Sequence, residues 1–266
     1  MTGAGTTASR LGEPDLGVAT VNDFVENGGM IVRVAKDVPV ICDADTGFGG
    51  PINIARTVEL YERAGIAALH IEDQGIPLIL SDIVIPKRCG HLLGKTVVSQ
   101  EEYTSRISAA CLAKSSQRSA PLIICRTDAV QPLGLDEAIS RMKQCYKIGA
   151  EIAFVEGILN EHDARKITSA LHPMPCLINL ATNGNTPNWT VKQCQEMGFR
   201  VVIFPCTGFC SVVHALRKAY SEVILEGTDV KACQGMSPKE FFEVVGLKEA
   251  MEIDAKAGGI AYNALK

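Results

Sequence analysis

The sequence predicts an α/β fold of the (β/α)8 TIM-barrel type, and three observations support this prediction. Six short apolar runs follow one another along the 266-residue chain, and segments of helical periodicity separate most of them. Continuous apolar strands that alternate with amphipathic helices are typical of a parallel sheet covered by helices. The regular spacing and the number of runs favour a barrel over an open doubly wound sheet, and no G-x-G-x-x-G motif opens a helix.

The predicted strands are centred near residues 42, 70, 125, 154, 178 and 203. Three of the predicted helices end in a glycine shortly before the next strand, at Gly65, Gly149 and Gly198. Glycine readily adopts the left-handed conformation that a helix C-cap requires. We therefore expect the chain to leave a helix and turn toward a strand at each of these positions.

The composition excludes several classes of protein. Apolar residues make up 47% of the chain and charged residues 21%, which predicts a buried core rather than disorder. The net charge is -4 and aromatic residues amount to only 5%, so nucleic acid is not an expected partner. No apolar segment is long enough to cross a bilayer and no signal pattern opens the chain, so no membrane partner is expected either.

The chain contains ten cysteines, which are scattered and form no C-x-x-C pair. Several lie inside apolar runs, such as residues 39–45 and 121–129. This distribution is typical of core thiols in a reducing compartment and not of a disulfide framework or a zinc site. We therefore expect a cytoplasmic protein.

Polar side chains follow most of the predicted strands. They are Asp43 and Asp45, Glu72 and Asp73, Arg126 and Asp128, Glu156, and Asn179. In a parallel barrel the carboxyl ends of all strands open on one face, so these side chains are expected to converge on one pocket. Asp43, Asp45 and Glu72 offer hard oxygen ligands, which suit Mg²⁺, with Mn²⁺ as the alternative. His70 lies between two apolar residues of a strand and is expected to be a core histidine rather than a ligand.

A second group of candidate functional residues lies in PKRCGH, residues 86–91, where Lys87, Arg88 and His91 surround Cys89. Neighbouring cations lower the pKa of a thiol, so Cys89 is the cysteine expected to be functional, the alternative being an exposed loop thiol. Arg126 ends an apolar strand and is expected to pair with a carboxylate. The residues leave open whether that carboxylate belongs to the substrate or to Glu156 or Asp128.

The motifs DADTGFG, HIEDQ, KRCGH followed by GK, RTDA and VEG resemble those of the isocitrate lyase/phosphoenolpyruvate mutase superfamily. The likeness runs across nearly the whole chain. Because its motif KRCGH contains a cysteine, the chain resembles the carbon–carbon lyase branch of this superfamily. That branch includes methylisocitrate lyases, dimethylmalate lyases and oxaloacetate hydrolases. The resemblance implies a Mg²⁺-dependent retro-aldol or retro-Claisen cleavage of a small 2-hydroxy or 2-oxo dicarboxylate.

The resemblance also implies roles for individual residues. The metal ligands would be Asp43, bound directly, and Asp45, Glu72 and Asp15, acting mainly through waters. The substrate-binding residues would be Thr2, Gly3, Ala4, Gly90, His91 and Asn179. Catalysis would rest on Cys89, Arg126 and Glu156, with Cys89 on a loop that closes over the site and protonates the departing carbanion.

Three departures from the family pattern bear on function. Residues 2–17 resemble the family's second strand and its loop, so the first βα unit is expected to be missing. The segment 75–86 is longer than its counterpart in relatives. Cys210 stands where methylisocitrate-cleaving members carry an arginine, and Ala129 where oxaloacetate-hydrolysing members carry a serine. A substituted malate or a related 2-hydroxy dicarboxylate is therefore the expected substrate.

Other functions remain open at this level. One is an oxaloacetate hydrolase or a carboxyphosphonoenolpyruvate phosphonomutase-like enzyme. Another, different in class, is a catalytically silent, truncated barrel that acts as a subunit.

The predicted organisation is a barrel over residues 1–236 and a C-terminal helical extension over residues 237–266. The extension reads as two amphipathic helices broken near Gly246. In the family such helices are swapped between neighbouring subunits. The resemblance therefore implies a homo-oligomer, either a dimer or a tetramer.

Overall fold

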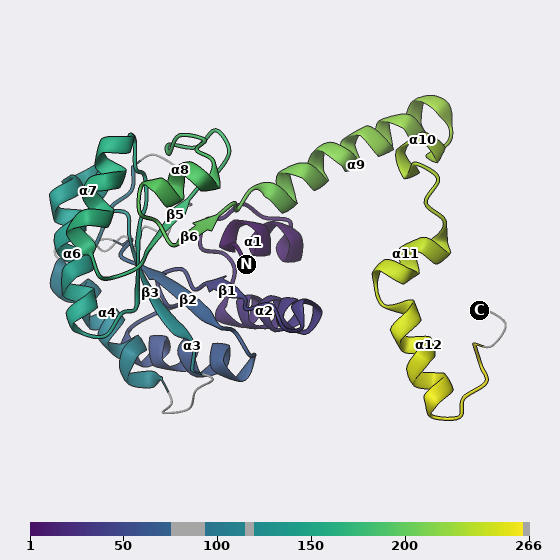
Figure 1. Ribbon diagram of the computed structural model, residues 1–266, viewed down its shortest axis with the longest axis horizontal. Helices are drawn as coiled ribbons and strands as arrows, with labels where there is room; N and C mark the ends of the chain where they lie inside the picture. The colour runs from purple at the N-terminus through teal and green to yellow at the C-terminus, as the bar shows by residue number, and fades with distance from the viewer. Residues whose placement is uncertain (76–93, 115–119, 263–266) are drawn as a thin grey trace. The chain divides into compact units, whose positions relative to one another are not determined.

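The computed structural model describes residues 1–75, 94–114 and 120–262 (Figure 1). The chain divides into two compact units, Met1–Gly208 and Phe209–Lys266. The predicted boundary between barrel and C-terminal extension, at residues 236 and 237, lies inside the second unit. The division into a barrel and an extension at this boundary stays a prediction.

The first unit is built on a parallel sheet of six strands in the order β1-β2-β3-β4-β5-β6. The strands are β1 (Ile41–Asp43), β2 (Ala68–Glu72), β3 (Leu122–Thr127), β4 (Ile152–Val155), β5 (Cys176–Asn179) and β6 (Val201–Ile203). All six predicted strand positions and the parallel α/β class are confirmed. Among the described strands β1 and β6 do not pair with each other, so the sheet is a curled half-barrel rather than a closed eight-stranded barrel.

Helices connect the strands and lie around the outside of the sheet (Figure 1). They are α2 (Val21–Ala35), α3 (Pro51–Arg63), α4 (Gln100–Ala113), α5 (Val130–Leu133), α6 (Leu135–Lys147), α7 (Glu161–Leu171) and α8 (Val191–Glu196). The predicted helix stops are confirmed, because Gly65, Gly149 and Gly198 have φ angles of 78°, 109° and 96°.

Apolar residues pack on both faces of the sheet because successive strand side chains point to opposite faces. On β3, for example, Ile123 and Cys125 belong to the large cluster of buried residues that also contains Tyr61 and Met142 of the helices. Ile124 belongs instead to a small separate cluster with Ala68, Ile152, Phe154 and Leu177. The sheet is therefore buried on both faces, as its continuous apolar strands predict.

The prediction for the N-terminal segment is wrong in one respect. Residues Gly3–Leu11 form a helix, α1, and not a strand with its loop. The segment lacks the alternation of a strand, and it buries Gly3, Thr6 and Thr7 at helical spacing. Met1 alone pairs like a strand residue, because its nitrogen donates to the carbonyl of Ile41 and its carbonyl accepts from the N–H of Asp43.

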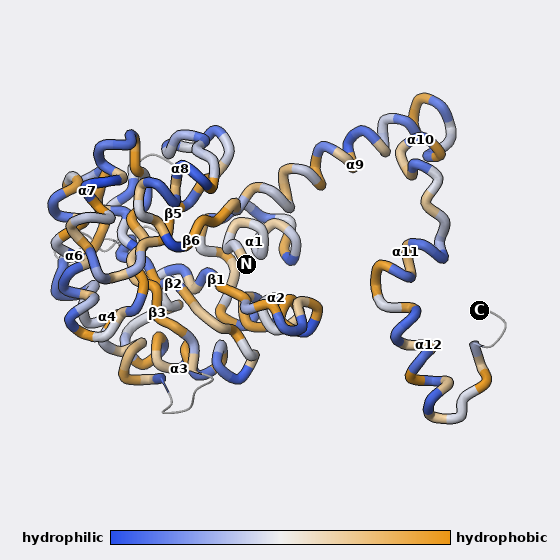
Figure 2. The backbone as a smooth tube through the Cα atoms, in the orientation of Figure 1, coloured by the Kyte–Doolittle hydropathy of each residue, from blue (hydrophilic) through white to orange (hydrophobic). Residues whose placement is uncertain are grey.

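The second unit is helical. Helix α9 (Thr207–Glu226) leads into it, followed by α10 (Val230–Cys233), α11 (Pro238–Val244) and α12 (Leu247–Lys256). The predicted break near Gly246 is confirmed, since this residue separates α11 from α12 with a φ of 98°. Many apolar side chains of the unit are exposed, among them Phe241 and Phe242, and orange segments mark α9, α11 and α12 in Figure 2.

None of the helices in the described ranges combines the length and the apolar character needed to cross a membrane.

Candidate active site

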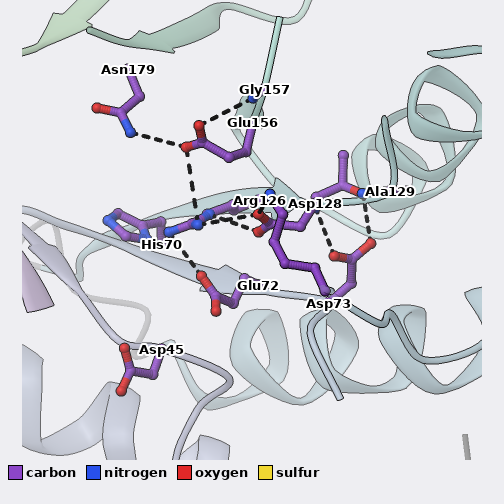
Figure 3. Close-up of polar contacts among 12 residues, drawn as sticks. Asp45, His70, Glu72, Asp73, Arg126, Asp128, Ala129, Glu156, Gly157 and Asn179 are labelled. Carbon is purple, nitrogen blue, oxygen red and sulfur yellow. Dashed lines mark hydrogen bonds and ion pairs between the residues drawn. The ribbon is translucent and has the colours of Figure 1, made fainter. Parts of the chain in front are cut away.

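The carboxyl ends of the strands bring together charged residues that are far apart in the sequence. Arg126, the residue before the last one of β3, lies between Glu72 of β2 and Glu156, which follows β4 (Figure 3). Its Nη1 is 2.8 Å from Glu72 Oε2, and its Nη2 is 4.0 Å from Glu156 Oε2. Its Nε donates to Asp128 Oδ2 at 3.1 Å. The sequence left open whether Arg126 pairs with a substrate carboxylate or with Glu156 or Asp128. The structure shows it paired with carboxylates of the protein, and Glu72 is a partner that the sequence did not indicate.

Burial and charge act in opposite directions on Arg126. Burial alone would lower its pKa, but the carboxylates of Asp128, Glu72 and Glu156 outweigh burial and hold the pKa well above its usual range. The guanidinium carbon also lies 5.1 Å from the centre of the Phe154 ring. Arg126 is therefore a fixed, permanently charged donor at this face of the sheet.

Asn179, at the end of β5, bonds to Glu156, the carboxylate that also faces Arg126. Its Nδ2 donates to Glu156 Oε2 at 2.9 Å, and the N–H of Gly157 donates to Glu156 Oε1 at 3.1 Å (Figure 3). Both carboxylate oxygens of Glu156 thus accept a hydrogen bond. The two predicted site residues Glu156 and Asn179 are in direct contact.

Asp43, at the end of β1, is held by the backbone of two different segments. The N–H of Asp45 donates to its Oδ1 at 2.9 Å, and the N–H of Gly3 donates to its Oδ2 at 3.0 Å. His70 Nδ1 lies 3.5 Å from Oδ1, and the His70 ring meets Phe154 edge-on at 5.4 Å. His70 is thus a buried histidine, as expected, but one that stands next to a predicted metal ligand.

The turn after β1 brings Asp45 back toward Asp43. Asp45 and Phe48 have φ angles of 47° and 62°, which are unusual for residues other than glycine. At Gly47, with a φ of 91°, an added Cβ would lie 2.4 Å from Ile54 Cγ1. The glycines of this motif therefore serve the tight turn that the sequence suggested, and the same turn buries Asp43 and Asp45.

Thr2, Gly3 and Ala4 lie at the N-terminus of α1, where Thr2 is the N-cap residue and makes no side-chain capping bond. The first N–H groups of a helix have no partner within the helix and attract anions. One of them, that of Gly3, already points at Asp43. The segment is thus next to the predicted metal ligand, although its structure is helical.

Two buried basic residues of this region were missed from the sequence. Lys95 Nζ lies 2.7 Å from Asp128 Oδ1, and Arg141 Nη1 lies 3.0 Å from Asp73 Oδ2. Burial raises the pKa of Asp128, but Arg126 and Lys95 lower it by more, so it lies below its usual range. Arg141 could have been noticed, because it occupies an apolar-face position of its helix, whereas nothing in the motif GK indicates that Lys95 is buried.

Asp73 has the opposite shift. Burial and then the negative charge of Asp128 raise the pKa of Asp73, and the hydrogen bonds from Thr127 and Asp128, together with the charge of Arg141, offset this only in part. The two adjacent carboxylates therefore differ in how firmly they hold a proton.

The residues present fit a hard divalent cation. Asp43, Asp45 and Glu72 are all buried carboxylates. In the described part of the first unit, buried carboxylates outnumber buried cations, and this surplus of negative charge is one that Mg²⁺ or Mn²⁺ would offset. Among the described residues no three His, Cys, Asp or Glu side chains converge as a ready metal cage. Mg²⁺ keeps several waters and commonly uses only one or two carboxylates.

Several predicted residues have another status. Cys89, Gly90 and His91, with the long segment before them, lie outside the described residues. Asp15 is half-buried in the loop between α1 and α2, and its role stays a prediction.

The structure shows no disulfide among the described cysteines. Burial raises the pKa of Cys42 to about 11 and that of Cys176 to about 12, which suits inert core thiols. The expectation of core thiols does not extend to Cys210 and Cys233, which are exposed.

Comparisons with known proteins agree on one family. The family model described as phosphoenolpyruvate phosphomutase matches residues 1–224. The 2,3-dimethylmalate lyase of Eubacterium barkeri is 34% identical over 255 residues, which are 96% of this chain and 84% of the relative. The 2-methylisocitrate lyase of Aeropyrum pernix is 37% identical over 257 residues, 96% of this chain and 78% of the relative.

A solved structure gives the same result for the fold. An oxaloacetate acetylhydrolase, in complex with the inhibitor 3,3-difluorooxalacetate, superposes with a TM-score of 0.91 and 44% sequence identity. The match covers 98% of this chain and 85% of that structure.

Proposed function

The chain belongs to the phosphoenolpyruvate mutase/isocitrate lyase superfamily, and we propose that it is a carbon–carbon lyase acting on small dicarboxylates. The observation that carries the proposal is the position of Arg126. A buried, permanently charged guanidinium lies between Glu72 and Glu156 at the carboxyl end of a parallel sheet, where the charge of Asp43 also acts on it. Such a donor can stabilise the oxyanion that forms when the bond breaks.

The reaction is a retro-aldol or retro-Claisen cleavage of a 2-hydroxy or 2-oxo dicarboxylate. At the start of α1 the backbone N–H of Ala4 and the hydroxyl of Thr2 bind a substrate carboxylate, while the N–H of Gly3 stays bonded to Asp43. Glu156, oriented by Asn179, accepts the proton of the substrate hydroxyl as the carbonyl forms and the carbon–carbon bond breaks, and the charge of Arg126 stabilises the resulting enolate. Cys89 protonates the departing carbanion, a role that rests on the resemblance of its motif alone.

Magnesium is part of the proposal. Asp43 would hold it directly, and Asp45, Glu72 and Asp15 would act mainly through waters. When bound, Mg²⁺ supplies a Lewis acid that orients and polarises the oxygens of a 2-oxo or 2-hydroxy acid. Mn²⁺ is the alternative, because it accepts the same hard oxygen ligands.

The preferred substrate is a substituted malate. Position 129 is a buried alanine, and Cys210 is exposed and carries no positive charge for an additional carboxylate. A second candidate is hydrolysis of oxaloacetate, which is favoured by the 44% identity with an oxaloacetate acetylhydrolase.

The test measures turnover of 2,3-dimethylmalate, 2-methylisocitrate and oxaloacetate with Mg²⁺, with Mn²⁺ and with a chelator. We expect metal-dependent cleavage of a malate derivative, and we expect Asp43→Asn to raise the Mg²⁺ concentration needed for half-maximal rate at least tenfold. The control is Asp136→Asn, at an exposed position of α6, which should behave as the wild type. A folded protein that turns over none of the three substrates would favour the silent subunit or the mutase-like alternative, and turnover of oxaloacetate alone would favour the hydrolase.

We also propose that the chain forms a homo-oligomer, either a dimer or a tetramer, through its second unit. The support is the set of exposed apolar side chains on α11 and the segment after it, which include Phe241, Phe242, Val244 and Val245. A cytoplasmic location is supported by the core thiols, which favour a reducing compartment.

A further inference from the structure

Two buried basic side chains, those of Lys95 and Arg141, pair with carboxylates next to Arg126, the residue expected to contact the substrate. The side chain of Lys95 is 1% exposed and pairs with Asp128, and that of Arg141 is 3% exposed and pairs with Asp73. Burying a charge is costly unless a partner compensates it, and removing one partner leaves the other charge uncompensated. Neither Lys95 nor Arg141 has a part in the chemistry proposed above.

The Lys95–Asp128 and Arg141–Asp73 ion pairs belong to one hydrogen-bonded network. The N–H of Asp128 donates to Asp73 Oδ1 at 2.9 Å, so the two carboxylate residues are bonded to each other. Arg141 Nη1 also donates to the carbonyl of Val98 at 2.9 Å, and the N–H of Val98 donates to the carbonyl of Asp73 at 2.9 Å. The segment that carries Lys95 is thereby fixed to the same residue that Arg141 holds.

The network of ion pairs and hydrogen bonds reaches Arg126 through Asp128. Asp128 accepts from Arg126 Nε at 3.1 Å and from Nη2 at 3.4 Å, while Nη1 of the same guanidinium faces Glu72 at 2.8 Å. Lys95 and Arg126 therefore share one carboxylate. Without Lys95, the whole charge of Asp128 would act on Arg126 and draw its guanidinium away from Glu72.

We propose that Lys95 and Arg141 are positioning residues, which fix Asp128 and Asp73 and thereby set the direction of the Arg126 guanidinium. The inference rests on the proposed function only in assigning Arg126 to the reaction. Its geometric part concerns Arg126 alone and is testable without turnover.

The chain offers a close control for each residue. Arg165 on α7 repeats the contacts of Arg141: each donates from Nε to a glutamate four residues earlier at 2.9 Å and from Nη1 to a backbone carbonyl. Arg165 is exposed, however, and its acidic partner is Glu161; within the described ranges no second carboxylate pairs with it as Asp73 pairs with Arg141. For Lys95 the control is Lys166, which pairs with Asp136 at 2.6 Å on the surface.

The experiment compares Lys95→Met with Lys166→Met, and Arg141→Met with Arg165→Met. The first readout is the ¹H–¹⁵N resonance of Arg126 Nε–Hε, assigned with Arg126→Lys. We expect it to move or broaden in Lys95→Met and Arg141→Met and to stay in place in both controls. The second readout is steady-state kinetics, in which kcat falls about 10²-fold in the Lys95 and Arg141 variants while KM changes less than about threefold.

An Arg126 resonance that is identical in all four variants, or a kcat that stays within about twofold of wild type, would overturn the inference. Should Lys95→Met or Arg141→Met fail to fold, Lys95→Gln and Arg141→Gln are read in the same way. If the wild type cleaves no dicarboxylate, the proposed function fails, and the Arg126 resonance alone decides whether Lys95 and Arg141 position this side chain.

Discussion

The backbone N–H of Gly3 donates to Asp43 Oδ2 at 3.0 Å, and this bond joins residues 40 positions apart in the sequence. It places the N-terminus of α1 against the end of β1. The approach is close, because a Cβ added at Gly3 would lie 2.6 Å from Asp43 Oδ2. A helix N-terminus suited to anions and a carboxylate suited to a metal therefore share one short contact.

Gly3→Ala tests this contact. The new methyl group would push the Asp43 carboxylate out of place, so we expect kcat/KM to fall at least about tenfold and the requirement for Mg²⁺ to rise. The measurement is steady-state kinetics over a Mg²⁺ titration. Gly50→Ala is the control, because an added Cβ there meets nothing within 4 Å. Equal kinetics in both variants would show that the contact has no functional role.

Arg126→Lys tests the central guanidinium. A lysine cannot face Glu72, Asp128 and Glu156 at once with a planar group, so we expect kcat/KM to fall about 10³-fold. Thermal unfolding should show a lower Tm, because buried carboxylates lose a partner. A variant that retained wild-type kinetics would remove Arg126 from the mechanism.

Asp128→Asn tests the pH dependence of stability. The pKa of Asp128 is lowered in the folded protein from an ordinary value of 3.8, so its stabilising contribution is complete above about pH 4 and is lost as the pH falls through the lower folded value. We expect the variant to be less stable than the wild type by about 3 kcal/mol at pH 7, with the difference shrinking toward pH 3. Denaturant unfolding at several pH values measures it. A difference that grew on acidification would contradict the assignment, and Asp136→Asn is the exposed control.

A double variant, Phe241→Ser with Phe242→Ser, tests the proposed assembly. Removing two exposed aromatic rings from α11 removes apolar surface that a second copy of the chain would cover, so we expect the oligomer to dissociate. Size-exclusion chromatography with light scattering gives the mass. Glu252→Gln on α12 is the control. A wild type that is monomeric at micromolar concentration would refute the proposal itself.

Much of the first unit could be predicted because its signals are local. Continuous apolar runs located the six strands, and glycine located the helix ends at Gly65, Gly149 and Gly198. The segment after Thr2 was assigned wrongly because it was read as a strand and loop from the resemblance of its motif, whereas the buried spacing of Gly3, Thr6 and Thr7 is helical. Closure of the barrel also could not be read from strand spacing, since it depends on which strands form the edges.

The candidate site divides in the same way. The polar groups at the strand ends could be located from the sequence, because a parallel sheet sends all its carboxyl ends to one side. Their pairing became known only from the fold: Arg126 faces Glu72 as well as Asp128, and Lys95 and Arg141 are buried beside Asp128 and Asp73. Strand position follows from local pattern, whereas the burial and the partner of a charge depend on residues brought close from distant parts of the chain.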